Sequence, residues 1–425
     1  MARSTRTRAR RAQSPSPESR RTRTGGGPPD AVPSARQSSL RTSNLALLAS
    51  RVFSSLEPVS RADIAAETGM TRSTASRLAD ELVAIGLVRE LDPVASSGPG
   101  RPAVPLLPAR GTFVALGLEV NVSRMAVRAV DLAGQVLAER VVVDDLEASD
   151  PAEVLPHLAR LTLEILDLHA VRSARKVGAA LALPGLVSRN RLLRAPNLAW
   201  QDLDPAPLLA PALAPEELVL RLGNEATFGA LTAGRSRPGA PQSESSYIYL
   251  SGEIGIGAAL VREGRVVEGS HGFAGEIGHI QVAPDGPECT CGNRGCLERY
   301  AGRRALLAAA GLPPTAQPEA LVAAWEAGEP SARKAVSHAA HALGAGLGAA
   351  INLLDIPTIV LGGHLAPLTE ALRPELEAEL THRVLASSWI DLKVVTAPDD
   401  QMPGATGAAW SLLEQVITDP AAFIA

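Results

Sequence analysis

Hydrophobic and polar positions divide the chain into three stretches with different patterns. Residues 1–39 are rich in Arg, Ser, Thr and Pro and carry no hydrophobic periodicity, so we expect a disordered basic tail. Residues 40–107 show the apolar spacing of short helices, followed by a proline-rich segment. From residue 112 to 425, strand-like and helix-like segments alternate. The pattern predicts a tail, a small helical domain and a larger α/β domain.

The small domain contains two adjacent helix signatures. Ser60-Arg61-Ala62-Asp63 fits a capping box that opens a helix through Glu67, and Gly69 supplies the following turn. Thr71 then caps a second helix, which runs from Arg72 to about Ile85. Apolar residues of this helix recur three, four and three apart, which predicts one buried face. Two helices joined by a glycine turn indicate a helix-turn-helix, although a plain helical hairpin would share these features.

The start of the second helix carries residue types that suit entry into the DNA major groove. Hydroxyls and arginines bond phosphates, and Arg also grips guanine bidentately in the major groove. The expected DNA-binding residues on this helix are Thr71, Arg72, Ser73, Thr74, Ser76 and Arg77. Leu87–Glu90 should open a β-wing, and Arg101 in Gly100-Arg101-Pro102 would enter the minor groove. A flexible linker explains the Arg101 segment equally well.

The larger domain repeats one order of elements. Predicted strands cover 113–118, 124–131 and 136–143, followed by a helix over 151–169 and a strand over 176–183. A second cycle begins with strands at 247–251, 255–261 and 265–267, and continues with a buried strand at 356–361 and a last helix over 404–417. Two α/β lobes with a cleft between them follow: about 112–235 plus the C-terminal helix, and about 245–403.

Charge is distributed unevenly along the chain. The first 40 residues hold nine Arg but only two acidic residues, whereas the whole chain has a net charge of −4. A basic arm on an acidic body suggests contact with nucleic acid at one end, but a merely solvated tail has the same composition. No apolar run is long enough to span a membrane, and the Arg-rich N-terminus lacks the apolar core of a secretory signal. We therefore expect a soluble, cytoplasmic protein without membrane partners.

All three cysteines lie within eight residues, close to a histidine. The spacing is His279-x9-Cys289-x-Cys291-x4-Cys296, and Gly286, Gly292 and Gly295 allow tight folding around an ion. Four nitrogen and sulfur ligands indicate one closed, tetrahedral, structural Zn²⁺ per chain in a loop over 279–298. No position remains for a metal-bound water, so the zinc is not expected to perform chemistry. Three buried or redox-active thiols are the alternative.

The segments around these ligands resemble a known family. Gly275-Glu276-Ile277-Gly278-His279 and Cys289-Thr290-Cys291-Gly292-Asn293-Arg294-Gly295-Cys296-Leu297-Glu298 are similar to the signature of the ROK family of repressors, open reading frames and sugar kinases. Leu183-Pro184-Gly185 and Ala195-Pro196-Asn197-Leu198-Ala199-Trp200 agree with it, and Arg41-Thr42-Ser43-Asn44 resembles its repressor branch. The resemblance covers about residues 40–420. It implies a winged helix-turn-helix followed by a two-lobed, actin-like sugar-kinase fold (ribonuclease H-like).

The resemblance also implies a sugar site in the cleft. By matching position, Asn224, Glu276, His279 and Glu298 would contact sugar hydroxyls, with Glu225 tuning the preference beside them. Carboxylates and amides suit vicinal hydroxyls, and one nitrogen of His279 would bind zinc while the other faces the sugar. Without the metal motif, solvated or loop-capping carboxylates would explain Glu276 and Glu298 equally well.

Three departures from the kinase pattern argue against phosphoryl transfer. The turn that is Asp-x-Gly-Gly-Thr in the family's kinases reads Glu119-Val120-Asn121-Val122-Ser123, where Val122 replaces a phosphate-approaching glycine. Glu253 in the second phosphate loop would repel a γ-phosphate, and Glu225 replaces the catalytic Asp that follows Asn224 in kinases. We therefore expect no enzyme activity.

The expected function is a transcriptional regulator, favoured as a repressor. Its partners would be a palindromic double-stranded DNA operator and a small sugar, and the protein would act as a homodimer or homotetramer. Sugar would shift the lobes, or Glu276 and the zinc loop, and so alter operator affinity. Two alternatives remain: a ROK sugar kinase with an attached DNA-binding domain, and a DNA-binding protein that answers to a protein partner and has an empty cleft.

Overall fold

A computed structural model describes residues 33–93, 104–252 and 254–424. It separates into two compact units, Met1–Arg41 and Thr42–Ala425, and the fold below is that of the second unit. The first helix, α1 (Pro33–Ser54), begins inside the segment 1–39 that the sequence predicts to be disordered. The predicted tail boundary at residue 39 therefore falls inside this helix, since low hydrophobicity does not prevent a helix from extending ahead of its buried part. The rest of the predicted tail, residues 1–32, lies outside the described residues.

The N-terminal head, which we define as residues 42–108, contains the two expected helices. Ser60 caps α2 (Arg61–Thr68) in a capping box: its hydroxyl accepts from Asp63 N–H, and the Asp63 carboxylate accepts from Ser60 N–H. Gly69 ends α2 in the left-handed conformation at φ 71°, and Thr71 caps α3 (Arg72–Ala84). The predicted helix-turn-helix is therefore confirmed.

A small sheet completes the head. Its strands are β1 (Val59–Ser60), β3 (Pro105–Pro108) and β2 (Val88–Glu90), in that order and all antiparallel. Leu45, Leu48 and Phe53 of α1 pack with Leu78 and Leu82 of α3 in one core. The β2–β3 pair is the expected wing. Its tip, including Arg101, lies outside the described residues, so the structure does not test the proposed minor-groove contact.

Lobe one is built on a five-stranded sheet of order β11-β7-β4-β5-β6. Its strands are β4 (Phe113–Val120), β5 (Arg124–Asp131), β6 (Val136–Val143), β7 (Arg175–Leu183) and β11 (Leu220–Asn224). β4, β5 and β6 form an antiparallel meander, whereas β7 and β11 run parallel to β4. A separate small sheet follows β7, with strands β8 (Leu186–Ser188), β9 (Arg191–Ala195) and β10 (Trp200–Leu203).

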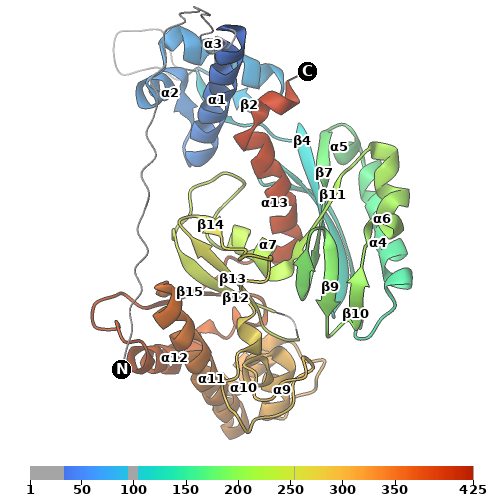
Figure 1. Cartoon of the computed structure of the whole chain (residues 1–425), viewed down its shortest axis with the longest axis vertical. Helices are drawn as coiled ribbons and strands as arrows, with labels where there is room; N and C mark the ends of the chain where they lie inside the picture. The colour runs from blue at the N-terminus through green and yellow to red at the C-terminus, as the bar shows by residue number, and fades with distance from the viewer. Residues whose placement is uncertain (1–32, 94–103, 253, 425) are drawn as a thin grey trace, which may run out of the picture. The chain divides into compact units, whose positions relative to one another are not determined.

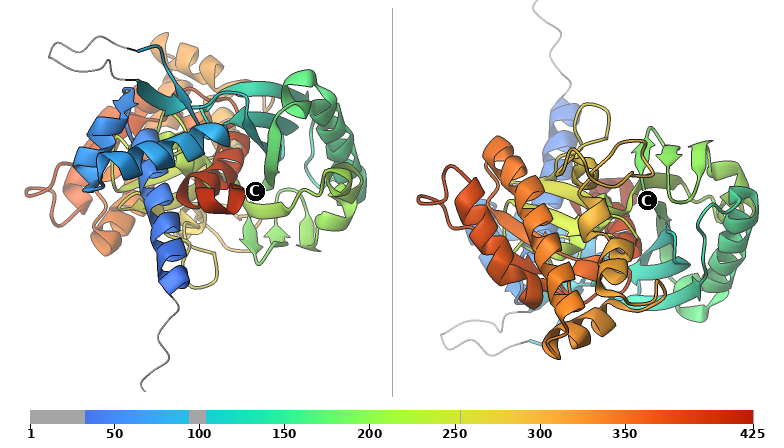
Figure 2. Two further views of the ribbon diagram at one scale, coloured as in Figure 1. Left: turned by 90° about the horizontal axis from the view of Figure 1, so that it is seen from above. Right: turned by 90° about the horizontal axis from the view of Figure 1, so that it is seen from below.

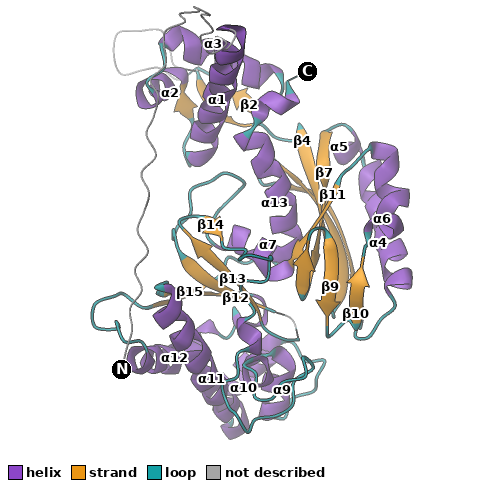
Figure 3. Ribbon diagram, in the orientation of Figure 1, coloured by secondary structure: helices purple, strands orange, loops and turns teal. Residues whose placement is uncertain are grey.

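Lobe two repeats the same topology. Its sheet has the order β14-β13-β12-β15-β16, formed by β12 (Tyr247–Ser251), β13 (Gly257–Arg262), β14 (Arg265–Val266), β15 (Thr358–Leu361) and β16 (Lys393–Thr396). Again a three-stranded antiparallel meander is extended by two parallel strands on the side of its first strand. Figure 3 shows the strands of both sheets in orange among the purple helices. The expected two α/β lobes are confirmed.

Helices cover the sheets. Asp150 caps α4 (Pro151–Asp167), which packs on lobe one near α5 (His169–Arg172) and α6 (Ala206–Leu213). Lobe two carries α8 (Glu298–Ala301), α9 (Arg303–Ala310), α10 (Pro318–Glu326), α11 (Pro330–Leu354) and α12 (Thr369–Arg383). Figure 2 shows α11 and α12 lying side by side, and their buried faces join the core of this lobe.

Two helices lie between the sheets. α13 (Pro403–Thr418), drawn in red in Figure 1, packs against β4 and β7 of lobe one. α7 (Glu225–Ala233) packs against α13 on one side and against β12 and β13 of lobe two on the other. Gly407 allows this close approach, because an added Cβ there would overlap the backbone carbonyl of Phe228. The last predicted helix is thus a central packing element.

Within the described residues, no helix is both long and apolar enough to cross a lipid bilayer.

Candidate metal centre and ligand pocket

The four predicted metal ligands meet in one cluster. The ligand atoms of His279, Cys289, Cys291 and Cys296 all lie within 4.8 Å of one another. His279 Nδ1 is 3.8 Å from Cys289 Sγ, and Cys291 Sγ is 3.8 Å from Cys296 Sγ. A tetrahedral ion with Zn–S bonds of ~2.3 Å separates its sulfurs by about 3.8 Å. The donor set and its spacing therefore fit a closed zinc site.

Backbone geometry holds the ligand loop in this form. Gly292 and Gly295 adopt positive φ, 99° and 66°, which favours residues without a Cβ. Gly295 also passes so close to the carbonyl of Ala283 that a side chain would collide with it. Cys289 N–H donates to Asn293 O at 2.8 Å, closing the turn between the cysteines. The glycines predicted to permit tight folding do so at these two positions.

The cysteines are poorly suited to free redox chemistry. None of the three forms a disulfide, and Cys289 and Cys296 are buried. Burial raises the pKa of both thiols, and the neighbouring Glu298 carboxylate raises it further. A reactive thiol needs a depressed pKa, whereas a bound cation would stabilise thiolates directly. The environment of Cys289 and Cys296 therefore disfavours the free, reactive thiolates that the redox alternative needs.

One pocket brings together all five residues predicted to contact sugar. We call it the ligand pocket, and its lining includes Asn224, Glu225, Glu276, His279 and Glu298. Pro184 and Gly185 after β7 and residues 254–257, which lead into β13, form other walls, so both lobes contribute. The chain thus places an amide, an imidazole and three carboxylates around one space.

The orientation of His279 suits two roles. Its Nδ1 faces the metal cluster, whereas its Nε2 lies 3.8 Å from Glu276 Oε2 inside the ligand pocket. Glu298 Oε1 accepts from Cys289 Sγ at 2.8 Å and lies 3.8 Å from His279 Nδ1. Burial raises the pKa of Glu276, Glu298 raises it further, and His279 opposes this shift. The metal cluster and the pocket therefore share a wall.

The ligand pocket also contains a polar residue that was not among the sugar contacts predicted from the sequence. Asn197, between β9 and β10, lines the same pocket, and its Oδ1 accepts from Thr290 Oγ1 at 3.3 Å. The Pro196-Asn197 pair directly after a strand was the available signal. Asn224 caps α7: its Oδ1 accepts from Ala226 N–H at 2.8 Å, and its Nδ2 donates to Gly185 O at 2.9 Å. Asn224 is therefore structural as well as pocket-lining.

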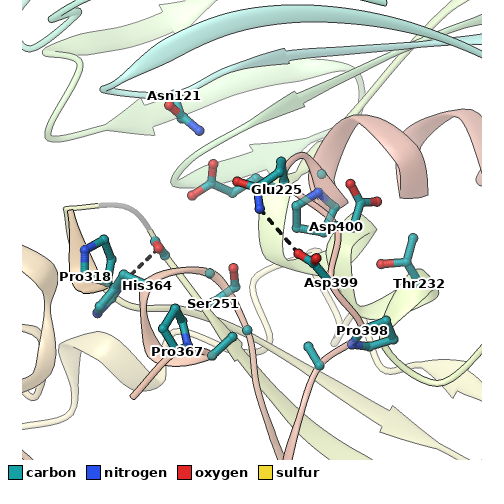
Figure 4. Close-up of a pocket in the computed structure, with 18 of the residues that line it drawn as sticks. Asn121, Glu225, Thr232, Ser251, Pro318, His364, Pro367, Pro398, Asp399 and Asp400 are labelled. Atoms are coloured by element: carbon teal, nitrogen blue, oxygen red, sulfur yellow. Dashed lines mark hydrogen bonds between the residues drawn. The ribbon is translucent and has the colours of Figure 1, made fainter. Parts of the chain in front are cut away.

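A second pocket, about 360 Å³ in volume, adjoins the first (Figure 4). The two share Asn121, Glu225 and Gly252. We call it the acidic pocket because Glu119, Glu225, Asp399 and Asp400 all line it. Arg124 and Arg303 are the basic residues of its lining. A phosphate chain would meet predominantly negative charge there. Glu253, which the sequence predicted to add to this repulsion, lies outside the described residues.

The turn between β4 and β5 is closed by its own side chain. Asn121 Oδ1 accepts from the backbone N–H groups of Ser123 and Arg124, at 3.0 and 3.1 Å. Backbone N–H groups in such a turn are what a phosphate would need. Val122, at 4% exposed, faces the lobe-one core. The departure noticed in the sequence at Val122 is therefore reinforced by Asn121, whose role the sequence did not reveal.

A buried carboxylate occupies the neighbouring helix end. Glu119 is 1% exposed. Its Oε2 accepts from Ala405 N–H at the start of α13 at 2.9 Å, and its Oε1 accepts from Asn121 Nδ2 and Arg124 Nε, both at 3.0 Å. Helix N-termini favour anions, and this one already holds an anion from the protein itself.

The predicted DNA-reading residues lie together at the start of α3. Thr71, Arg72, Ser73 and Arg77 are exposed, whereas Thr74 and Ser76 are half-buried. Thr71 Oγ1 accepts from Thr74 N–H at 3.2 Å, so this hydroxyl is used in capping. Arg77 pairs with Glu81 at 2.6 Å. Arg72 therefore presents a long cationic side chain at the helix start.

Comparisons with known proteins agree with this arrangement. The ROK family profile matches residues 115–415, and the profile of the IclR helix-turn-helix domain matches residues 51–92. The xylose repressor of Bacillus spizizenii is 29% identical over 274 residues, covering 64% of this chain and 69% of the repressor.

Two solved structures share the fold. A ROK family transcriptional regulator, described as a homologue of the E. coli MLC protein, superposes with a TM-score of 0.72 at 27% identity, covering 91% of this chain and 99% of the regulator. The ROK hexokinase from Thermus thermophilus gives a TM-score of 0.57 at 28% identity, covering 71% of this chain and 99% of the hexokinase. The regulator covers more of the chain than the hexokinase does, and the ROK profile match spans more than half of it. The chain belongs to the ROK family.

Proposed function

We propose that this chain is a DNA-binding transcriptional repressor whose operator affinity changes when a sugar binds, and that it performs no phosphoryl transfer. The observation that carries the proposal is one chain joining a helix-turn-helix to a pocket of sugar-binding groups with a closed phosphate turn beside it. Relatives named as repressors support the regulatory role.

The proposed metal is one structural Zn²⁺ per chain. His279, Cys289, Cys291 and Cys296 would hold it, and their spacing supports tetrahedral coordination. Four protein ligands leave no position for a reacting water. The role of the metal is to position the pocket wall, because His279 belongs to both sites and Glu298 contacts Cys289.

The proposed ligand is a sugar with vicinal hydroxyl groups. Glu276 and Glu298 would accept hydrogen bonds from sugar hydroxyls, Asn224 would offer its amide, and His279 Nε2 would complete the wall. Buried polar pairs of this kind give specificity, because an analogue that lacks one hydroxyl leaves its partner unsatisfied. Glu225 lies where the ligand pocket meets the acidic pocket and would set preference for that edge of the sugar.

Phosphoryl transfer is disfavoured by two features. Asn121 occupies the turn N–H groups, and Glu119 occupies the N-terminus of α13. Positioning and electrostatic stabilisation supply nearly all catalysis of phosphoryl transfer, so a protein that fills both anion sites with its own groups loses that stabilisation.

On DNA, α3 would enter the major groove with Arg72 and Arg77 near bases or phosphates, and Arg101 would reach the minor groove. A homodimer or homotetramer would place two heads on half-sites about 34 Å apart. Sugar binding would change the spacing and orientation of the two heads, so that the operator is released. This is a shift between the populations of two states.

The test uses the full-length protein, loaded with zinc. A duplex is first selected by the protein from a random-sequence DNA library, and its affinity is measured with and without D-xylose, D-glucose or N-acetyl-D-glucosamine. We expect at least one sugar to raise the melting temperature and to weaken the operator complex. Operator affinity that no pentose or hexose of a wider panel alters would refute the sugar response. Sugar-dependent ATP turnover would refute the absence of kinase activity.

A further inference from the structure

Arg237 joins the ligand-binding domain to the head through the end of α1. Its Nη1 donates to the carbonyl oxygen of Phe53 at 2.7 Å, and its Nη2 donates to the carbonyl oxygen of Ser55. The guanidinium also lies over the Phe53 ring, 6.0 Å from the ring centroid. The last carbonyls of a helix have no intrahelical partner and carry partial negative charge, so a cation is favoured there. One side chain thus caps α1.

The capped end of α1 is part of the head's core. Phe53 is fully buried and packs in the same cluster as Leu78 and Leu82 of α3. Arg51, one helical turn before the cap, forms an ion pair with Glu67 at the end of α2. A displacement of the C-terminal end of α1 must therefore displace α2 and the DNA-reading helix α3 as well, because close-packed cores do not deform continuously.

A single helix, α7, separates Arg237 from the ligand pocket along the chain. Asn224 lines that pocket and caps α7, and α7 ends at Ala233. A helix of nine residues spans about 13 Å, so α7 connects the pocket to the Arg237 loop as one short rigid rod. Arg235, in the same loop, pairs with Glu414 of α13 and donates to Gly264 O at 3.1 Å.

α13 reinforces the same connection. Its backbone meets that of α7 at Gly407, opposite the carbonyl of Phe228. At its other end, Ile417 approaches Phe53 across Gly239, where an added Cβ would lie 2.9 Å from Phe53 Cβ and 3.0 Å from Ile417 Cδ1. The Arg237 loop and the end of α13 therefore both reach Phe53, and α7 leads into that loop.

We infer that Arg237 is the positioning residue that couples occupation of the ligand pocket to the orientation of the DNA-reading head. The inference rests on the proposed function and adds the route and the residue. Sugar contacts at the Asn224 end of α7 would shift that helix along its axis or rotate it. The two hydrogen bonds and the stacked ring would carry the shift into α1. Burial lowers the pKa of the Arg237 guanidinium, but Arg stays charged in proteins, so the cap keeps its cation.

The experiment separates coupling from binding. In full-length protein, Arg237→Ala removes the cap, and Arg237→Lys keeps the charge but cannot span two carbonyls or stack as a plane. Arg140→Ala is the matched control, because Arg140 is 43% exposed and pairs only with exposed partners on lobe one. For each protein, the dissociation constants of sugar and of the selected operator are measured alone and together, with the most effective of D-xylose, D-glucose and N-acetyl-D-glucosamine as the probe.

Coupling between two sites usually changes affinity by about 5–150-fold. We expect wild type and Arg140→Ala to show a change in that range, and both Arg237 variants to show less than about a 2-fold change. Sugar affinity of the DNA-free variants should stay within about 2-fold of wild type, since Arg237 does not line the pocket. Replacing a residue with a merely structural role would not abolish the sugar effect on operator affinity while leaving sugar affinity unchanged.

Three other results would contradict the coupling role of Arg237. Variants that keep the wild-type sugar effect on operator affinity overturn the inference while leaving the proposed function intact. Loss of operator binding by both variants in sugar-free buffer also overturns it, because Arg237 would then only support the folded head. A wild-type protein that no sugar affects refutes the proposed function and the inference together, and this is established before any variant is compared.

Discussion

The contact between α7 and α13 makes a sharp prediction about Gly407. In Gly407→Ala, the new Cβ would overlap the carbonyl oxygen of Phe228, and it would still lie 3.1 Å from the Phe228 Cα. The neighbour is backbone, which cannot rotate away as a side chain would. An unstrained C···O contact needs about 3.3 Å, so the two helices must separate by roughly 1 Å or more.

Two effects of opposite sign then compete. Replacing a helix-interior glycine by alanine stabilises a helix by about 1 kcal/mol. Overpacking a core usually costs about 1–3 kcal/mol, and a radial gap of 0.5–1 Å forfeits about a quarter to a half of each dispersion contact. α13 is buried on several sides, from Gly404 to Ile417, so many contacts open at once. We expect the steric term to win and the protein to lose about 2 kcal/mol of stability.

Thermal unfolding followed by circular dichroism measures this difference. Gly346→Ala is the control: it lies inside α11, and its nearest neighbour is the flexible end of Leu297 at 3.2 Å. We expect the control to melt close to wild type and Gly407→Ala to melt several degrees lower. A Gly407→Ala protein that melts at or above both would show that the helices do not approach as described.

Three further predictions concern the sites. Cys291→Ser should lose the stoichiometric zinc, measured by atomic emission, and lose the sugar response, whereas sugar-free DNA binding by the head should persist; a full sugar response would contradict a zinc-organised pocket. Arg72→Ala should weaken operator binding and lower the slope of log affinity against log salt by about 1, and an unchanged slope would exclude a phosphate contact. Glu119→Ala should cost about 1–3 kcal/mol, a loss visible in urea unfolding, because the buried carboxylate accepts from Ala405 N–H, Asn121 and Arg124; Glu139→Ala, whose carboxylate is 48% exposed, should cost far less.

Much of the fold followed from local patterns. The capping box at Ser60, the strands β4 to β7 and the last helix were predicted within a few residues, because each has a strong local signal. The hairpin β8–β9 and the strand β11 were not predicted. Their positive-φ residues, such as Arg189 and Asn190, are not glycines, so the usual turn signal is missing. The start of α1 was also misplaced, since its first residues are polar.

The site divides in a similar way. Residues close in sequence, such as the three cysteines, indicate a common metal ion by their spacing alone. The convergence of Asn224 with Glu276 depends on how two lobes meet, and only the family resemblance pointed to it. Arg237 and Asn121 gave no signal, because an arginine cap and an Asn-closed turn depend on partners that only the folded chain supplies.

The closed turn at Asn121 has a consequence for how such proteins diverge. Restoring glycine at Val122 alone would leave the turn N–H groups bonded to Asn121, and removing Asn121 would strip a partner from the buried Glu119. Removing Glu119 in turn takes one partner from Arg124 and leaves the N–H of Ala405, at the start of α13, without its acceptor. Each single step toward a phosphate site is thus disadvantageous until several have occurred. Such epistasis acts as an evolutionary ratchet: a lineage that has become a sensor in this way does not readily return to being an enzyme.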